Sequence, residues 1–159
     1  KSGYHILLSA SANDEEEIAR SEKYAATAGK MRTAMHEVIG HASGQLEPNV
    51  SASSQTLKEF ASTIEEGRAD LVALYYVMDP KLVEMGLMES LEVGKAEYDG
   101  YIRNAMMVQM RRLKIGEDIA EAHMRNRAWI SNWLIEKGAS ANVISREVRE
   151  GKTYFNIKI

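Results

Sequence analysis

The chain has 159 residues and a net charge of −3, with 20 basic and 23 acidic side chains, so its charge gives no reason to expect a nucleic-acid partner. It contains no cysteine, which excludes disulfides and thiolate ligands and leaves nitrogen and oxygen donors for any metal site. No apolar stretch approaches the roughly 20 residues that a membrane span requires, so we expect no membrane partner either.

The first part of the chain predicts a short extended segment followed by one long helix. Residues 3–12 form an apolar run that is typical of a strand or an extended segment. Asn13 and the acidic residues after it form a capping sequence, and the helical pattern continues from there to His41. Residues 42–54 contain glycine, proline and several serines and are predicted to be a loop. One or two helical turns should follow at residues 57–61.

The rest of the chain predicts further helices and a hairpin. Residues 62–65 have the sequence of a second capping box and open a helix that continues to about Tyr76. Longer helices are expected at residues 89–113 and 117–137. Residues 143–159 contain a Glu-Gly turn between two β-prone runs, which predicts a β-hairpin.

Together these patterns predict a mainly α-helical fold that forms a single domain over residues 1–159. The expected β structure is limited to the short extended segment at the N-terminus and the hairpin at the C-terminus. A chain of this length can bury a core of its own, and no repeat or linker divides it.

Residues 36–41, HEVIGH, carry most of a zinc site. Neutral imidazole is a favoured zinc ligand, and a neighbouring carboxylate such as Glu37 can take a proton from zinc-bound water. His36 and His41 are five residues apart, so a regular helix would place them about 140° apart around its axis. They converge only if the helix widens locally, as in a π-helical turn, and Gly40 lowers the cost of that distortion. The alternative is two unrelated histidines on one helix.

A catalytic zinc needs a third protein ligand, and an acidic cluster on the next long helix is the best candidate. Glu65 and Glu66 are adjacent, and Asp70 lies one turn after Glu66 on the same face. One carboxylate would bind the metal, and the others would accept N–H bonds from the ligand imidazoles. The alternative is a solvated acidic helix start that is satisfied by the helix dipole and by Arg68. Gly67, inside this helix, indicates close packing against the histidine helix.

A third polar stretch contains His123 and Arg127, which share one helix face. A histidine at this place could donate a hydrogen bond to an oxyanion, and the arginine could orient a peptide carbonyl or the histidine itself. The alternative is that both are ordinary surface residues of a charged helix.

Taken together, the three stretches resemble the dipeptidyl-peptidase III family of zinc exopeptidases. The family signatures H-E-x-x-G-H and E-E-x-R-A-[ED] are matched by HEVIGH at 36–41 and EEGRAD at 65–70. The helix that carries the family's catalytic histidine is matched by AHMRNR at 122–127. The flanking residues are especially similar to the bacterial branch, and the resemblance extends from about Glu15 to the C-terminal hairpin.

The resemblance implies one Zn²⁺ per chain, bound by His36, His41 and Glu66. It implies that Glu37 is the general base, which activates the zinc-bound water and then passes its proton to the leaving amine. The implied reaction is the removal of dipeptides from the free N-terminus of oligopeptides.

The resemblance also implies roles for the groups around the metal. Glu65 and Asp70 would be hydrogen-bond partners of the ligand histidines. His123 would stabilise the tetrahedral intermediate, with Arg127 close to it.

Members of this family have two lobes around a wide cleft, so the chain would be the helical, zinc-bearing catalytic lobe alone. The expected partners are an oligopeptide substrate and the missing second lobe of the same protein. We expect a cytoplasmic location, with the periplasm as the alternative because a signal peptide would lie outside this chain. Two other functions stay open, a non-catalytic helical peptide-binding or interaction domain and a zinc hydrolase with a different substrate range.

Overall fold

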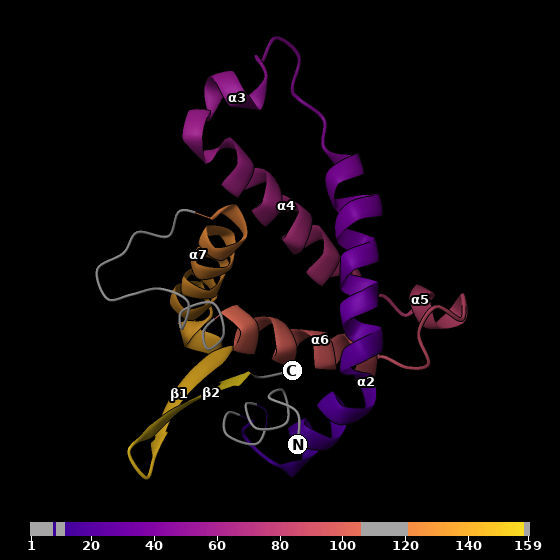
Figure 1. The fold of residues 1–159 in the computed structure, drawn as a ribbon, viewed down its shortest axis with the longest axis vertical. Coiled ribbons are helices and arrows are strands. Elements are labelled where there is room, and N and C mark those ends of the chain that lie inside the picture. Colours follow the sequence, from indigo (N-terminus) through magenta and orange to yellow (C-terminus); the bar gives the residue numbers. More distant parts are fainter. Residues whose placement is uncertain (1–7, 9–11, 106–120, 158–159) are drawn as a thin grey trace.

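The computed structural model describes residue 8, residues 12–105 and residues 121–157. For Thr153 and Phe155 it describes only the backbone. In this part of the chain the fold is mainly α-helical with a C-terminal hairpin, which confirms the predicted fold class (Figure 1). No helix among these residues has the length and apolar character to cross a membrane. Whether residues 1–159 form a single domain stays a prediction.

Four long helices and one hairpin form the frame that positions the site (Figure 1). Helix α2 packs along α6 and against α4, while α4 packs against α7, and the hairpin adjoins α6 and α7. The bounds of the helices and strands are α2 Glu15–Ala34, α3 Ser53–Thr56, α4 Ala61–Tyr76, α5 Lys81–Glu84, α6 Glu92–Arg103, α7 Ala122–Lys137, β1 Ile144–Arg149 and β2 Lys152–Ile157.

Helix α2 begins one residue later than the sequence predicts. The N-cap is Asp14, whose carboxylate accepts a hydrogen bond of 2.8 Å from the backbone N–H of Glu17. The Glu17 carboxylate reaches back to the N–H of Asn13 at 2.8 Å and also pairs with Arg103 of α6. The reciprocal capping predicted from Asn13 and Glu16 therefore exists, but Asp14 and Glu17 form it, one residue later. We attribute the shift to Glu17, because it is the buried carboxylate that pairs with a cation, Arg103.

Helix α4 lacks the predicted capping box. The helix begins at Ala61, and no side chain in the described structure caps its N-terminus. Ser62 is therefore already inside the helix. Glu65, which was expected to complete the box, instead accepts hydrogen bonds from Arg68 and contacts His41. A charged partner binds a carboxylate more strongly than a neutral backbone N–H does, and this accounts for the difference.

Several other predicted segments fall partly outside the described residues. The helix expected at 117–137 is seen as α7, which begins at Ala122 after the extended N-cap residue Glu121. The helix expected at 89–113 is seen as α6, and residues 106–120 are not described. Most of the segment expected to be extended at 3–12 also lies outside the description. At Leu8 the chain is helical, and the N–H of Ala12 donates to the carbonyl oxygen of Leu8 at 2.8 Å.

Most of the buried apolar side chains form two clusters that hold the helices together. The larger cluster joins α2, α4 and α6 and consists of Ala28, Met35, Ala73, Val77, Leu82, Met88, Val93 and Ala96. The smaller joins α6 and α7 to the hairpin and consists of Tyr101, Ile102, Ile130 and Ile144. Helix α6 contributes to both clusters, so it fixes α2 and α7 relative to each other.

The hairpin agrees with its prediction in position and in its turn residues. Strands β1 and β2 are antiparallel, with Arg149 paired to Lys152, so the turn consists of Glu150 and Gly151. Both turn residues have positive φ, 50° and 75°, as a tight two-residue hairpin turn requires. The Arg149 guanidinium also donates to the carbonyl oxygen of Asn13 at 2.9 Å, which ties the hairpin to the start of α2.

Glycines allow two close helix approaches, and the sequence-based interpretation of Gly67 is wrong. A Cβ on Gly67 would lie 2.6 Å from the indole ring of Trp129, so this glycine faces α7 and not the histidine helix. The close approach to the histidine segment occurs at Gly40. A Cβ there would lie 2.9 Å from the Cα, Cβ and backbone oxygen of Ala69 in α4.

We predict that Gly40→Ala lowers the free energy of unfolding by about 1–3 kcal/mol, because backbone atoms of Ala69 would have to move away. Gly29→Ala is the matched control, since Gly29 lies in α2 and an added Cβ there meets nothing within 4 Å. This control should be neutral or stabilising by up to about 1 kcal/mol. Denaturant unfolding measures both, and equal effects of the two substitutions would contradict the prediction.

Candidate metal centre

The histidine segment adopts the widened helix that its spacing predicts. Residues Met35–Gly40 form a π-helical turn that continues α2, and the backbone N–H of His41 donates to the carbonyl oxygen of His36. Because one turn here spans five residues, both imidazoles lie on the same side. Their ring centroids are 4.6 Å apart, with an angle of 87° between the ring planes.

Helix α4 brings a carboxylate to the two imidazoles. Oε2 of Glu66 lies 3.2 Å from Nε2 of His36 and 3.9 Å from Nε2 of His41. The donor atoms of these three residues all lie within 4.8 Å of one another. Oε2 of Glu66 is buried, and within the described structure it accepts no hydrogen bond of good geometry. Two imidazoles and one such carboxylate oxygen are a donor set that fits a divalent metal ion.

Asp70 holds the ring of His36. Its Oδ1 lies 2.8 Å from Nδ1 of His36, and the aspartate is only 1% exposed. When Nδ1 donates its proton to this carboxylate, the lone pair of Nε2 points toward Glu66 and is available to a metal ion. Arg32 of α2 lies 3.5 Å from the same Oδ1 and contributes positive charge to the buried carboxylate.

Glu65 holds the ring of His41 in the same manner, but near the surface. Its Oε1 lies 2.9 Å from Nδ1 of His41, and both oxygens accept hydrogen bonds from the Arg68 guanidinium, at 2.9 and 2.6 Å. The Arg68 bonds, with help from His41, lower the pKa of Glu65 to about 2. The hydrogen bond that Glu65 accepts from the His41 imidazole in turn raises the pKa of His41.

His123, at the start of α7, also reaches the cluster. Its Nε2 lies 3.1 Å from Oε2 of Glu66, and its side chain is 51% exposed. The Glu121 carboxylate accepts from Nδ1 of His123 at 2.7 Å, and it also accepts from the backbone N–H groups of His123 and Met124. One side chain therefore caps α7 and orients the imidazole, with Nε2 directed at the cluster.

The two remaining site candidates are Glu37 and Arg127. Glu37 is exposed on the π-helical turn, and its charge contributes to the raised pKa of His41 after the larger effects of Glu65 and Glu66. Arg127 extends toward Asp70, and its guanidinium lies 4.0 Å from Oδ2 of Asp70 and 5.6 Å from the centre of the Tyr101 ring. The structure thus brings Arg127 to Asp70 and not to His123.

Sequence reasoning missed three residues that contact this site. Arg32 and Tyr101 contact Asp70, and Glu121 contacts His123. Glu121 could have been found, because it directly precedes the helix that carries His123 and can cap it. Arg32 and Tyr101 carry no comparable local signal, since each meets Asp70 only through the packing of another helix against α4.

Comparison with known proteins identifies the family. The sequence matches Peptidase family M49 over residues 47–159, which is more than half of the chain. The matched range includes Glu65, Glu66, Asp70 and His123, while HEVIGH precedes it. A search of the curated proteins gave no match. The match and the sequence motifs agree, and the chain belongs to peptidase family M49, the dipeptidyl-peptidase III family.

Proposed function

We propose that this chain is the metal-bearing catalytic part of a zinc-dependent exopeptidase that removes dipeptides from the N-terminus of oligopeptides. Membership of a peptidase family points to a peptide substrate. The observation that carries the proposal is the convergence of His36, His41 and Glu66, whose donor atoms lie within 4.8 Å of one another.

The donor set favours zinc as the metal. Two neutral imidazoles and one carboxylate, with no sulfur ligand, form a common set of protein ligands in zinc hydrolases, which leave one position open. When bound, zinc would polarise the scissile carbonyl and lower the pKa of a water molecule. Asp70 and Glu65 support this role, because each fixes one ligand imidazole so that its Nε2 faces Glu66.

Glu37 is the proposed general base. It directly follows the ligand His36 and lies on the exposed side of the π-helical turn, where water and a peptide can reach it. A carboxylate at this place can accept a proton from the attacking water and later donate it to the leaving amine. Metal binding itself does not require this residue, so its presence favours an enzyme over a binding domain that keeps the metal.

His123 is the proposed donor to the developing oxyanion. Its Nε2 faces the cluster from α7, and Glu121 fixes the direction of the ring. Because Nδ1–H donates to Glu121, Nε2 can donate to an oxyanion only when both ring nitrogens carry protons. Arg127 would act on the site through Asp70, the partner of His36, because its guanidinium lies 4.0 Å from Oδ2. A second lobe of the protein would hold the peptide backbone and complete the substrate cleft.

Metal analysis is the first test. We expect about one zinc per wild-type chain after dialysis and little in His41→Ala or Glu66→Ala, because each substitution removes one of three proposed ligands. Glu59→Ala is the matched control, since Glu59 is an exposed acidic residue just before α4 and should leave the zinc content unchanged. Normal zinc in Glu66→Ala would place the third ligand elsewhere.

Glu37→Gln tests the general base. The amide cannot accept the proton, so peptidase activity should fall by about 100-fold or more while the zinc content stays at the wild-type level. The release of dipeptides from an oligopeptide, followed by mass spectrometry, measures the activity. Unchanged turnover would remove Glu37 from the mechanism and favour a different hydrolytic site.

His123→Ala separates an oxyanion donor from a metal ligand. Since Nε2 of His123 lies as close to Glu66 as that of His36 does, geometry alone allows either role. We expect full zinc content with a kcat lower by about 100-fold, as for the loss of an oxyanion-hole donor. Loss of zinc in this variant would instead make His123 a ligand.

A further inference from the structure

The two oxygens of the buried Asp70 have different partners. Oδ1 lies 2.8 Å from Nδ1 of His36, and Oδ2 accepts a hydrogen bond of 3.0 Å from the hydroxyl of Tyr101 in α6. Asp70 is 1% exposed and Tyr101 is 3% exposed, so protein groups and not bulk water set the direction of this carboxylate.

We propose that Tyr101 is a positioning residue of the metal centre: its hydroxyl fixes the carboxylate of Asp70, which in turn fixes the ring of His36 for metal binding. The proposal rests on the proposed function, in which His36 is a ligand. Tyr101 lies outside the direct contacts of the three proposed ligands and acts through Asp70.

The hydroxyl acts as a donor. Burial, together with the nearby Asp70 carboxylate, raises the pKa of Tyr101 above its ordinary value, so the phenol keeps its proton. An ionised aspartate offers only acceptors, and the direction of the hydrogen bond is therefore fixed. A neutral donor orients Asp70 without adding positive charge beside the imidazole that must bind a cation.

Two arginines show what the hydroxyl prevents. Arg32 lies 3.5 Å from Oδ1 and Arg127 lies 4.0 Å from Oδ2, and each also has another partner, Glu97 and Asn104 respectively. Without the hydroxyl, Oδ2 would be a buried acceptor with no close donor, which is unfavourable. Rotation of the carboxylate toward Arg127 would relieve this, but it would also move Oδ1 away from His36.

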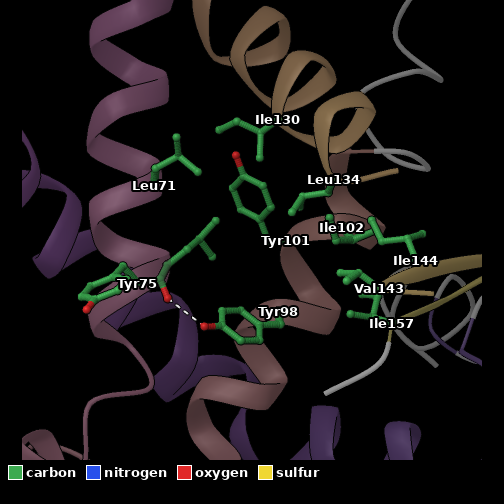
Figure 2. A pocket seen from close by; sticks show the side chains of 11 residues that line it. Leu71, Tyr75, Tyr98, Tyr101, Ile102, Ile130, Leu134, Val143, Ile144 and Ile157 are labelled. Atoms are coloured by element: carbon green, nitrogen blue, oxygen red, sulfur yellow. Dashed lines mark hydrogen bonds between the residues drawn. The ribbon is translucent and has the colours of Figure 1, made fainter. Parts of the chain in front are cut away.

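The ring of Tyr101 lines an apolar pocket of about 430 Å³ between α4, α6, α7 and the hairpin (Figure 2). Tyr98, one turn earlier on α6, lines the same pocket. Its hydroxyl donates to the backbone oxygen of Leu74 at 3.0 Å (Figure 2). The two tyrosines thus share a helix, a pocket and a donated hydrogen bond to α4, and they differ in whether the acceptor is Asp70.

The test compares Tyr101→Phe with Tyr98→Phe in the purified protein. Each substitution removes one hydroxyl and keeps the ring. Competition with a chromophoric chelator should show zinc binding weaker by about 3- to 10-fold in Tyr101→Phe. This is less than the roughly 10- to 100-fold loss typical for residues that hydrogen-bond directly to a metal ligand, because Tyr101 acts through Asp70. Tyr98→Phe should stay within about twofold of the wild type. Unchanged or tighter zinc binding in Tyr101→Phe, or an equal loss in both variants, would overturn the proposal.

A second measurement separates positioning from general stability. The visible absorption of the Co²⁺-substituted protein reports ligand geometry, and we expect it to change in Tyr101→Phe but not in Tyr98→Phe. Thermal unfolding of the metal-free variants shows whether either substitution loosens the fold. A lower unfolding temperature in Tyr101→Phe with an unchanged zinc affinity and Co²⁺ spectrum would assign the hydroxyl a purely structural role and overturn the proposal.

His36→Ala distinguishes failure of this inference from failure of the proposed function. If His36→Ala binds zinc as tightly as the wild type, or if the wild type binds none, the proposed metal ligands are wrong, and so is the proposed role of Tyr101. If His36→Ala loses zinc while Tyr101→Phe matches Tyr98→Phe, the metal centre stands and only the positioning role is wrong.

Discussion

The hydrogen bond from the N–H of His41 to the carbonyl of His36 is the interaction on which the site depends. It closes a turn of five residues, and this turn alone allows two imidazoles at that spacing to face one carboxylate. The turn must also lie against α4 so that Glu66 can reach it, and Gly40 permits this by bringing its backbone against Ala69. The widened turn and the close helix contact therefore work together, and either one alone would leave the three donors apart.

The two histidines are supported in chemically different ways. Asp70 is buried and takes its second hydrogen bond from a neutral phenol, whereas Glu65 is half-buried and is bound by a guanidinium. The Arg68 hydrogen bonds keep Glu65 ionised well below neutral pH. Near the surface, where water weakens electrostatic interactions, a full cation is needed to fix a carboxylate. At the buried Asp70 the hydrogen bond to Oδ2 comes from a neutral donor, while Arg32 and Arg127 contribute positive charge from 3.5 and 4.0 Å.

The local features of the site could be predicted from the sequence, while its long-range contacts could not. The five-residue histidine spacing indicated a widened helix, and the Glu-Gly pair indicated a hairpin turn, because both depend on neighbouring residues alone. The packing partner of Gly67 was predicted wrongly, because a glycine in a helix indicates a close neighbour but does not identify the helix that supplies it. Tyr101 was missed because a tyrosine on a partly apolar helix face has the pattern of an ordinary core residue, and only the packing of α6 against α4 directs its hydroxyl to Asp70.

The hydrogen bond between Arg149 and the carbonyl oxygen of Asn13 joins two distant parts of the chain, which affects the entropy of loop closure during folding. It closes a loop between residues that are 136 positions apart, whereas Nδ1 of His36 and Oδ1 of Asp70 meet across 34 positions. The entropy lost on closing a loop rises with its length, so joining the hairpin to α2 is the more demanding closure. The three proposed ligands thus lie within the shorter loop, and they can meet without the hairpin having docked.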